Sequence, residues 1–148
     1  MKINNYLTGT YGTKELDQSL IDKIMGFLVS KRSRVSNIYS SGPKHREIQK
    51  LIYNDPSIVF NGLEKILFKG LEIPLGETEA DVVVLTNYNL HIFEIKKTKR
   101  KGRGIAGRNQ LTMIYDALFS EFKVQSRLFS VVWSRKKGLI IKEKIILY

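Results

Sequence analysis

The sequence predicts a single α/β domain with a central mixed β-sheet of about five strands flanked by helices. Two changes of pattern along the chain predict this class. Up to residue 54, apolar residues recur at helical intervals, whereas from residue 62 runs of Ile, Leu, Val and Phe alternate with turn residues. A further helical segment then separates two last strand-like runs. The predicted order is α-α-β-β-β-α-β-β, which differs from a regular βαβ winding.

Two helices are predicted before the first strand. Residues 14–31 form the first, with Thr13 available as its N-cap and apolar residues at helical intervals: Leu16, Leu20, Ile24, Phe27 and Leu28. The second covers residues 44–54, and Pro56 ends it. We therefore expect one domain over residues 1–148, with a helical extension at about residues 1–42.

The strands are predicted from β-branched and aromatic runs. We expect three, over residues 63–74, 80–86 and 90–96. The segment Thr86-Asn-Tyr-Asn89 is the tightest turn signal and joins the last two as a hairpin. After a basic, glycine-punctuated loop at 97–108, a helix is expected over 109–122 and two strands around the turn at 135–138.

The charge balance favours a polyanionic partner. Lys and Arg total 25 against 14 acidic residues, a formal net charge of +11. Nucleic acid is favoured over membrane, because no basic amphipathic helix stands out and no apolar run is long enough to span a bilayer. A solubility charge, or the lysine-rich usage of some thermophiles, is the alternative explanation.

The absence of cysteine excludes disulfides and thiolate metal sites. Together with an N-terminus that does not read as a secretory signal, it indicates an intracellular, cytoplasmic protein. The lysine- and isoleucine-rich usage is typical of an archaeon or its viruses.

The hairpin DVVVLTNYNLHIFEIK carries charged residues where an apolar sequence would be expected. Side chains alternate along a strand, so Glu94 and Lys96 face the same side, and closure of the hairpin brings Asp81 near them. Two carboxylates with a lysine suit Mg²⁺, a hard cation that prefers a few oxygen ligands and retained waters. The sequence therefore predicts a divalent-cation site at this end of the hairpin.

The spacing D-(x)12-E-I-K resembles the motif of the PD-(D/E)xK nuclease superfamily. The segments REIQKLIYNDPSIVFNGLE, GETEADVVVL, HIFEIK and NQL look like the nuclease domain of archaeal endonucleases that cut mismatched or branched DNA. Their order is also similar to that of archaeal Holliday-junction resolvases. The resemblance covers about residues 44–118.

The resemblance implies a restriction-endonuclease-like fold and a set of active-site residues. Asp81 and Glu94 would bind Mg²⁺ or Mn²⁺, and Lys96 would assist the attacking water. Glu47 would complete the metal shell directly or through water, and Gln110 would support the site. It also implies a homodimer, for which the apolar stripe of the first helix is a candidate interface.

Two departures from the family pattern bear on these assignments. Ala80 stands where the superfamily often has proline, and Ile114 stands where a related branch has tyrosine, with Tyr115 one position later. A helical step of about 100° per residue turns Tyr115 away from the expected direction.

The loop that follows the hairpin is expected to clamp the DNA backbone without reading its sequence. Its candidate DNA-binding residues are Lys97, Lys99, Arg100, Lys101, Arg103 and Arg108.

Simpler structural explanations apply to several of these residues. Glu94 and Lys96 would also fit an exposed pair on an edge strand. Glu77 and Glu79 compete for a ligand role, while His45 is expected at the surface and His91 on the opposite face of the sheet.

The function predicted from the sequence is a metal-dependent DNA endonuclease, structure-specific for branched or junction DNA, in repair or recombination. The alternatives are a nucleic-acid-binding protein that retains the nuclease fold without catalysis, and a nuclease directed at RNA.

Overall fold

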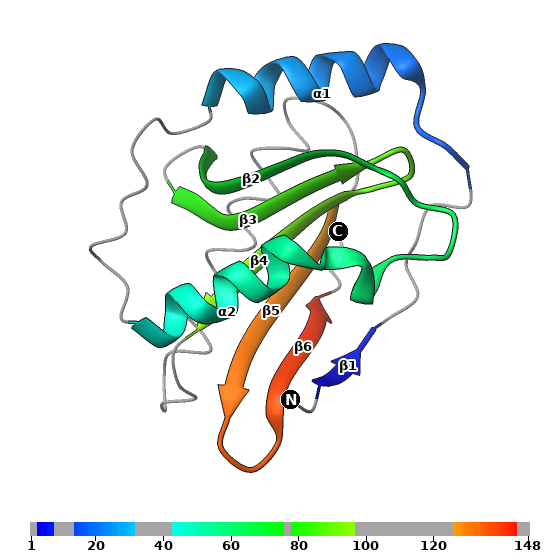
Figure 1. The fold of residues 1–148 in the computed structure, drawn as a ribbon. Coiled ribbons are helices and arrows are strands. Elements are labelled where there is room, and N and C mark those ends of the chain that lie inside the picture. The colour runs from blue at the N-terminus through cyan, green and yellow to red at the C-terminus, as the bar shows by residue number, and fades with distance from the viewer. Residues whose placement is uncertain (1–2, 8–13, 32–42, 76–77, 97–125, 145–148) are drawn as a thin grey trace.

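The fold is a six-stranded mixed sheet with helices packed on both faces (Figure 1). The computed structural model describes residues 3–7, 14–31, 43–75, 78–96 and 126–144. The helices are α1 (Gln18–Lys31), α2 (Pro43–Asn54) and the 3₁₀ helix η1 (Pro56–Val59). The strands are β1 (Ile3–Tyr6), β2 (Ile66–Leu75), β3 (Thr78–Thr86), β4 (Leu90–Lys96), β5 (Ser126–Ser134) and β6 (Gly138–Lys144).

The strand order is β1-β6-β5-β4-β3-β2, which places β4 in the interior of the sheet. Strands β2, β3 and β4 form an antiparallel meander, β5 runs parallel to β4, and β6 returns antiparallel to β5. The predicted α/β class, with a mixed sheet flanked by helices, is confirmed. The arrangement is consistent with the restriction-endonuclease-like fold that the resemblance implies.

The predicted hairpin between β3 and β4 is confirmed, and its turn is closed by Thr86. The backbone N–H of Thr86 donates to the carbonyl of Asn89 at 2.9 Å, and the Thr86 hydroxyl accepts from the N–H groups of Tyr88 and Asn89. One buried side chain thus satisfies two backbone donors, and none of the residues 86–89 has the positive φ that would favour glycine.

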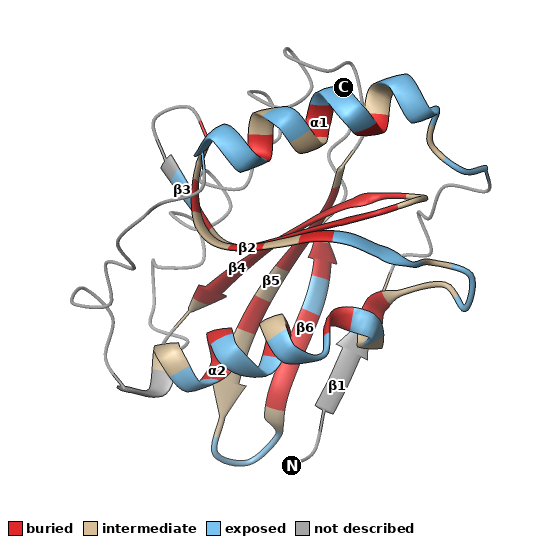
Figure 2. Cartoon of the chain, turned by 45° about the horizontal axis from the view of Figure 1, so that its top comes forward, coloured by how far each residue is buried: buried red, intermediate tan, exposed pale blue. Residues whose placement is uncertain are grey.

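Two hydrophobic layers hold the helices to the sheet (Figure 2). On one face, Ile21, Ile24 and Leu28 of α1 pack against β2, β3, β4 and β5. On the other face, Ile48 and Ile52 of α2 pack against β3, β4, β5 and β6. The apolar stripe of α1, considered above as a dimer interface, is therefore covered by the chain's own sheet.

The N-terminal region differs from the prediction. Residues 3–6 form a strand that pairs parallel to β6, where a helical extension was expected, and α1 begins at Gln18 rather than at residue 14. The strand sequence Ile-Asn-Asn-Tyr has no apolar alternation, and its partner lies at the other end of the chain, so local pattern could not reveal it.

The strand expected from residue 63 begins at Ile66, because Asn61 and Glu64 organise a loop before it. The helix expected over 109–122 lies outside the described residues. None of the described helices has the length and apolar character needed to cross a membrane.

Candidate active site

The predicted hairpin site lies where β3 and β4 stop pairing through their backbones. The ladder between these strands runs from Leu85–Leu90 to Val82–Phe93. Beyond it, the carboxylate Oδ2 of Asp81 accepts the backbone N–H of Ile95 at 2.7 Å. The register of the ladder sets Asp81 directly across from Glu94, so the two carboxylates are neighbours.

Glu94 is buried beside Asp81 without full compensation. Its relative exposure is 3%, and its Oε1 has no hydrogen-bond partner within the described part of the chain. Burial raises the pKa of Glu94 to about 9, and repulsion from Asp81 adds to the rise; a hydrogen bond with the Asp81 backbone and the charge of Lys96 oppose it. The Glu94 carboxyl therefore keeps its proton at neutral pH, beside the carboxylate of Asp81.

Lys96 ends β4 and is half-buried. It acts electrostatically on Glu94, two residues before it on the same strand. The structure thus brings together Asp81, Glu94 and Lys96, as the alternation along the hairpin predicted. The alternative of an exposed pair on an edge strand is wrong, because β4 is interior and Glu94 is buried.

Helix α2 approaches Asp81 with two side chains. The Nε2 atom of His45 lies 3.6 Å from Oδ2 of Asp81, and their side chains are 14% and 18% exposed. Gln49 is buried, and its Nε2 donates to the backbone carbonyl of Asp81 at 2.9 Å. The expectation that His45 lies at the surface is therefore wrong.

Glu47 was expected from the family resemblance to reach this site from the same helix. It is exposed, and it lies two residues from both His45 and Gln49, about 200° around the helix from each. Helical phase directs Glu47 away from the side of α2 that carries His45 and Gln49, and its role in the site stays a prediction. His45 and Gln49 occupy the face where an acid was expected.

Glu72 on β2 is a further carboxylate near Asp81, which sequence reasoning missed. It lies across from Asp81, between the pairs Leu71–Val82 and Ile73–Ala80, and has a positive φ of 49°. Burial raises the pKa of Glu72, a hydrogen bond with Gln49 opposes the rise, and repulsion from Glu79 and Asp81 adds to it. A non-glycine residue in this backbone region is uncommon.

A sequence signal for Glu72 did exist, in the form of a single acid inside the apolar strand ILFKGLEIPL. A strand pattern cannot show which way such a side chain turns when the backbone departs from extended geometry. Glu79, which the sequence offered as a competing metal ligand, is exposed on β3.

Several predicted residues lie outside the described residues. These are Gln110, the competing acid Glu77, and the candidate DNA-binding residues Lys97, Lys99, Arg100, Lys101, Arg103 and Arg108.

The donor set of the site suits a hard divalent cation. In the part of the chain that the structure describes, no three His, Cys, Asp or Glu side chains already surround one point. Mg²⁺ needs no such cage, because it commonly binds through one or two carboxylates and retains several waters. The unpartnered, buried oxygen of Glu94 beside the Asp81 carboxylate fits that mode of binding.

The chain has limited similarity to known proteins. No protein-family model and no curated protein matches the sequence. The chain is similar to a solved structure described as "Structure of EndoMS-dsDNA2 complex", with 19% sequence identity and a TM-score of 0.47. The match covers 66% of this chain and 39% of that one, so this chain spans about two fifths of the other's length. A likeness of this extent assigns neither a family nor an activity.

Proposed function

We propose that the protein is a metal-dependent endonuclease that hydrolyses phosphodiester bonds in DNA. Asp81 and Glu94 would hold Mg²⁺ or Mn²⁺, with Lys96 beside them. The observation that carries the proposal is the buried, unpartnered oxygen of Glu94 next to a second carboxylate on the neighbouring strand.

The adjacent carboxyl groups of Asp81 and Glu94 lower the stability of the fold when no cation is bound. Two adjacent carboxylates repel each other, and burial of one of them adds a desolvation penalty. A bound divalent cation would offset both the repulsion between the carboxylates and the desolvation of Glu94. Binding a cation is a role that two apolar side chains could not fill. When bound, the cation would lower the pKa of a water molecule and offset negative charge on the phosphodiester.

Lys96 places a positive charge next to Glu94 at the end of β4. From the end of β4, its ammonium group can donate hydrogen bonds to a phosphate oxygen or hold the attacking water in place. A lysine in this position stabilises the additional negative charge that develops as water attacks phosphorus.

DNA as the substrate is supported by charge and by the order of the sequence motifs. The net charge of +11 favours a polyanion, and the predicted basic loop directly follows Lys96 in the sequence. Branched or junction DNA is the specific substrate we propose. A homodimer would place two such sites so that both strands are cut.

Cleavage of labelled nucleic acids tests the proposal. Purified protein would be incubated with a four-way junction, duplex DNA, single-stranded DNA and RNA, in Mg²⁺ or in EDTA. We expect DNA cleavage in Mg²⁺ that is lost in EDTA and in the variants Asp81→Asn, Glu94→Gln and Lys96→Met, while DNA binding is retained.

The amide variants are chosen because Asn at position 81 keeps an oxygen that can accept the Ile95 N–H. Tight DNA binding by the wild-type protein without metal-dependent cutting would overturn the proposal in favour of a non-catalytic binding protein. Cutting confined to RNA would instead identify a ribonuclease.

A further inference from the structure

Asp81 lies where the backbone ladders on both sides of β3 are interrupted. The β2–β3 ladder passes over the position of Asp81, and the β3–β4 ladder ends at the neighbouring Val82. Glu72, which lies across from Asp81 on β2, has a positive φ of 49° that breaks the extended backbone of that strand. The position of Asp81 therefore depends on hydrogen bonds that involve side chains.

Gln49 of α2 holds the backbone carbonyl of Asp81. Its Nε2 lies 2.9 Å from the carbonyl oxygen, and the residue is 5% exposed. A carbonyl oxygen only accepts hydrogen bonds, so Gln49 presents its NH₂ group to Asp81. The contact joins α2 directly to the residue that carries one of the two proposed metal ligands.

The same side chain also forms a hydrogen bond with Glu72. This bond favours the ionised form of the Glu72 carboxyl, because it opposes the rise in pKa that burial causes. An ionised carboxylate accepts hydrogen bonds and donates none, so the donor is again the NH₂ group of Gln49. One buried amide therefore ties α2 to β2 and β3 at the gap in their ladder.

The carboxylate of Asp81 is fixed from the other side, by β4. Its Oδ2 accepts the backbone N–H of Ile95 at 2.7 Å, and a further hydrogen bond joins the Asp81 backbone to Glu94. A displacement of the Asp81 backbone would therefore move its carboxylate relative to that of Glu94, and both are proposed ligands of one cation.

We infer that Gln49 is a positioning residue of the active site, which holds the backbone of Asp81 so that its carboxylate meets the cation beside Glu94. The inference rests on the proposed function and names a further residue on which that function depends. Because Gln49 is buried, it acts through Asp81 and not by contact with DNA. Small displacements of a metal ligand weaken metal binding and slow the reaction.

Cleavage of labelled duplex and four-way junction DNA by Gln49→Met tests the inference. Methionine has a similar volume and cannot donate a hydrogen bond. We expect kcat to fall by about 10- to 100-fold and the Mg²⁺ concentration at half-maximal rate to rise about 10-fold, with KM for DNA unchanged. A smaller fraction of folded protein would leave that Mg²⁺ concentration unchanged. Asn54→Met, at an exposed position of the same helix, is the matched control and should keep wild-type values.

Exchange of the two side chains separates positioning from support of the fold. Gln49→Glu keeps the shape of the side chain, removes its donors and sets a carboxylate against Glu72. Addition of Glu72→Gln restores a hydrogen bond between these positions, while the carbonyl of Asp81 still lacks its donor. In urea unfolding, the double variant should recover the stability lost in Gln49→Glu, whereas its kcat should stay about 10-fold or more below that of Glu72→Gln alone. Recovery of both stability and kcat would mean that Gln49 only supports the fold, and would overturn the inference.

Hydrogen exchange at the Ile95 amide gives a readout that does not require catalysis. This amide donates to Oδ2 of Asp81, so loss of the Gln49 contact should speed its exchange about fivefold in Gln49→Met. The Thr86 amide, which donates to Asn89 at the far end of the hairpin, is the internal control and should keep its rate.

Unchanged exchange at Ile95 in Gln49→Met would overturn the inference, and so would a wild-type kcat in that variant. A wild-type protein that cuts no DNA would overturn the nuclease proposal instead, and the exchange rate at Ile95 would still decide whether Gln49 holds Asp81 in place.

Discussion

Glu94 occupies a position where an apolar side chain would stabilise the fold. It lies on an interior strand between Phe93 and Ile95, both of which belong to the hydrophobic layer under α2. Its own carboxylate is buried beside that of Asp81, and repulsion between the two adds to the cost of burial. The residue therefore reduces the free energy of unfolding for as long as no cation is bound.

Glu94→Gln is expected to stabilise the metal-free protein. The pKa of Glu94 is raised to about 9, so the folded state holds this proton more tightly than the unfolded chain. Stability is therefore lost as the pH rises from about 4.5 toward 9, and the neutral amide avoids that loss. Urea unfolding in EDTA at pH 7 should show a gain of about 1–2 kcal/mol.

The same variant should show no gain at about pH 4, where Glu94 is protonated in the folded state. A loss of stability at pH 7 would mean that the ionised carboxylate supports the fold, which would remove the main physical argument for a cation site.

The individual site residues differ in how far the sequence could predict them. Asp81, Glu94 and Lys96 follow from strand alternation and hairpin closure, which are regular. The side chains that α2 directs toward Asp81 depend on helical phase, where a shift of two residues moves a side chain to the other side of the helix. Glu72 could not be placed, because its backbone leaves extended geometry.

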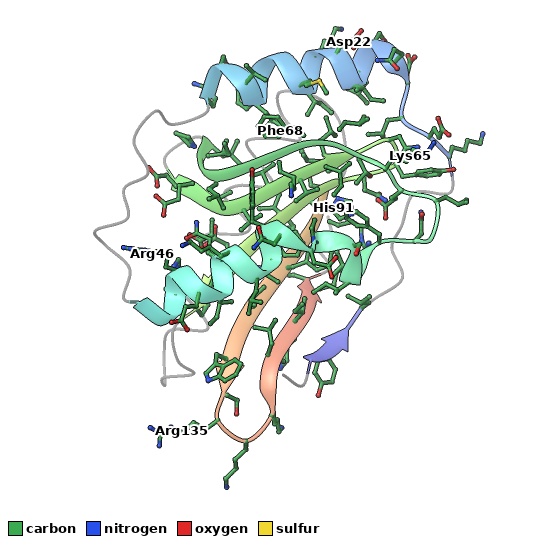
Figure 3. The ribbon with its side chains drawn as sticks, viewed as in Figure 1. Asp22, Arg46, Lys65, Phe68, His91 and Arg135 are labelled. Atoms are coloured by element: carbon green, nitrogen blue, oxygen red, sulfur yellow. The ribbon has the colours of Figure 1, made fainter. Side chains whose placement is uncertain are left out.

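At the scale of elements, Glu64 connects the segment after η1 to the β3–β4 turn. Its carboxylate accepts hydrogen bonds from the Thr86 hydroxyl, the Asn89 amide and the backbone N–H of Asn61, each at 2.8 Å. It also lies 3.1 Å from Nε2 of His91, which lies among the strands (Figure 3). This network holds the turn at the far end of the hairpin from the candidate site.

Glu64→Gln is expected to destabilise the protein by about 1–3 kcal/mol at pH 7, because it weakens the hydrogen bonds with Thr86 and Asn89 and removes the acid beside the buried His91. Burial alone would raise the pKa of Glu64, but hydrogen bonds from His91 and Asn89 outweigh it and lower the pKa to about 2. The stabilisation is therefore present above about pH 4.5 and lost as the pH falls toward 2.

Urea unfolding of both proteins across this pH range measures the effect. The difference between wild type and Glu64→Gln should shrink as the pH falls. A difference that stays constant down to about pH 2 would contradict an electrostatic origin.

Strand β2 contains a glycine required by close packing. A Cβ at Gly70 would lie 2.7 Å from Cδ1 of Ile73 and 2.9 Å from Cε1 of Phe68. Gly70→Ala should therefore destabilise the protein by about 1–2 kcal/mol through overpacking. Gly62→Ala is the matched control, because nothing lies within 4 Å of the added Cβ.

Chemical denaturation compares these two variants. Equal stability in both would show that the side chains of Phe68 and Ile73 can move aside, and that packing does not require glycine at position 70.

Elements with local signals were predicted well, and elements defined by distant partners were not. The β3–β4 hairpin and the β5–β6 hairpin were found from turn residues and β-branched runs. Strand β1 was missed because it joins the sheet through a parallel ladder with β6, and a polar four-residue segment gives no sign of such pairing.

At the scale of the whole molecule, the excess of positive charge is expected to govern DNA affinity. The triple variant Arg100→Gln, Lys101→Gln and Arg103→Gln lowers the net charge of +11 by three. Binding should weaken, and the slope of log affinity against log salt should become shallower by up to about 0.9 for each lost phosphate contact.

Fluorescence anisotropy with a duplex and a four-way junction at several salt concentrations measures this slope. The matched control replaces Arg135, Lys136 and Lys137 by glutamine, which removes the same number of positive charges from the exposed β5–β6 turn (Figure 3). An equal effect of both triples would mean that DNA affinity follows total charge and that residues 97–108 do not act as a specific clamp.

The hydrogen bond from the Ile95 N–H to Asp81 gives position 81 a structural role in addition to its proposed catalytic role. A descendant that had lost its chemistry would still need an oxygen acceptor at position 81 to keep β3 and β4 joined, and asparagine would serve. At position 94, glutamine could make the hydrogen bonds that the side chain forms with Asp81, so the fold does not require an acid there. In related proteins, a glutamate at position 94 would therefore indicate nuclease activity more reliably than an acid at position 81. An apolar residue at position 94 would indicate a protein that binds DNA without cutting it.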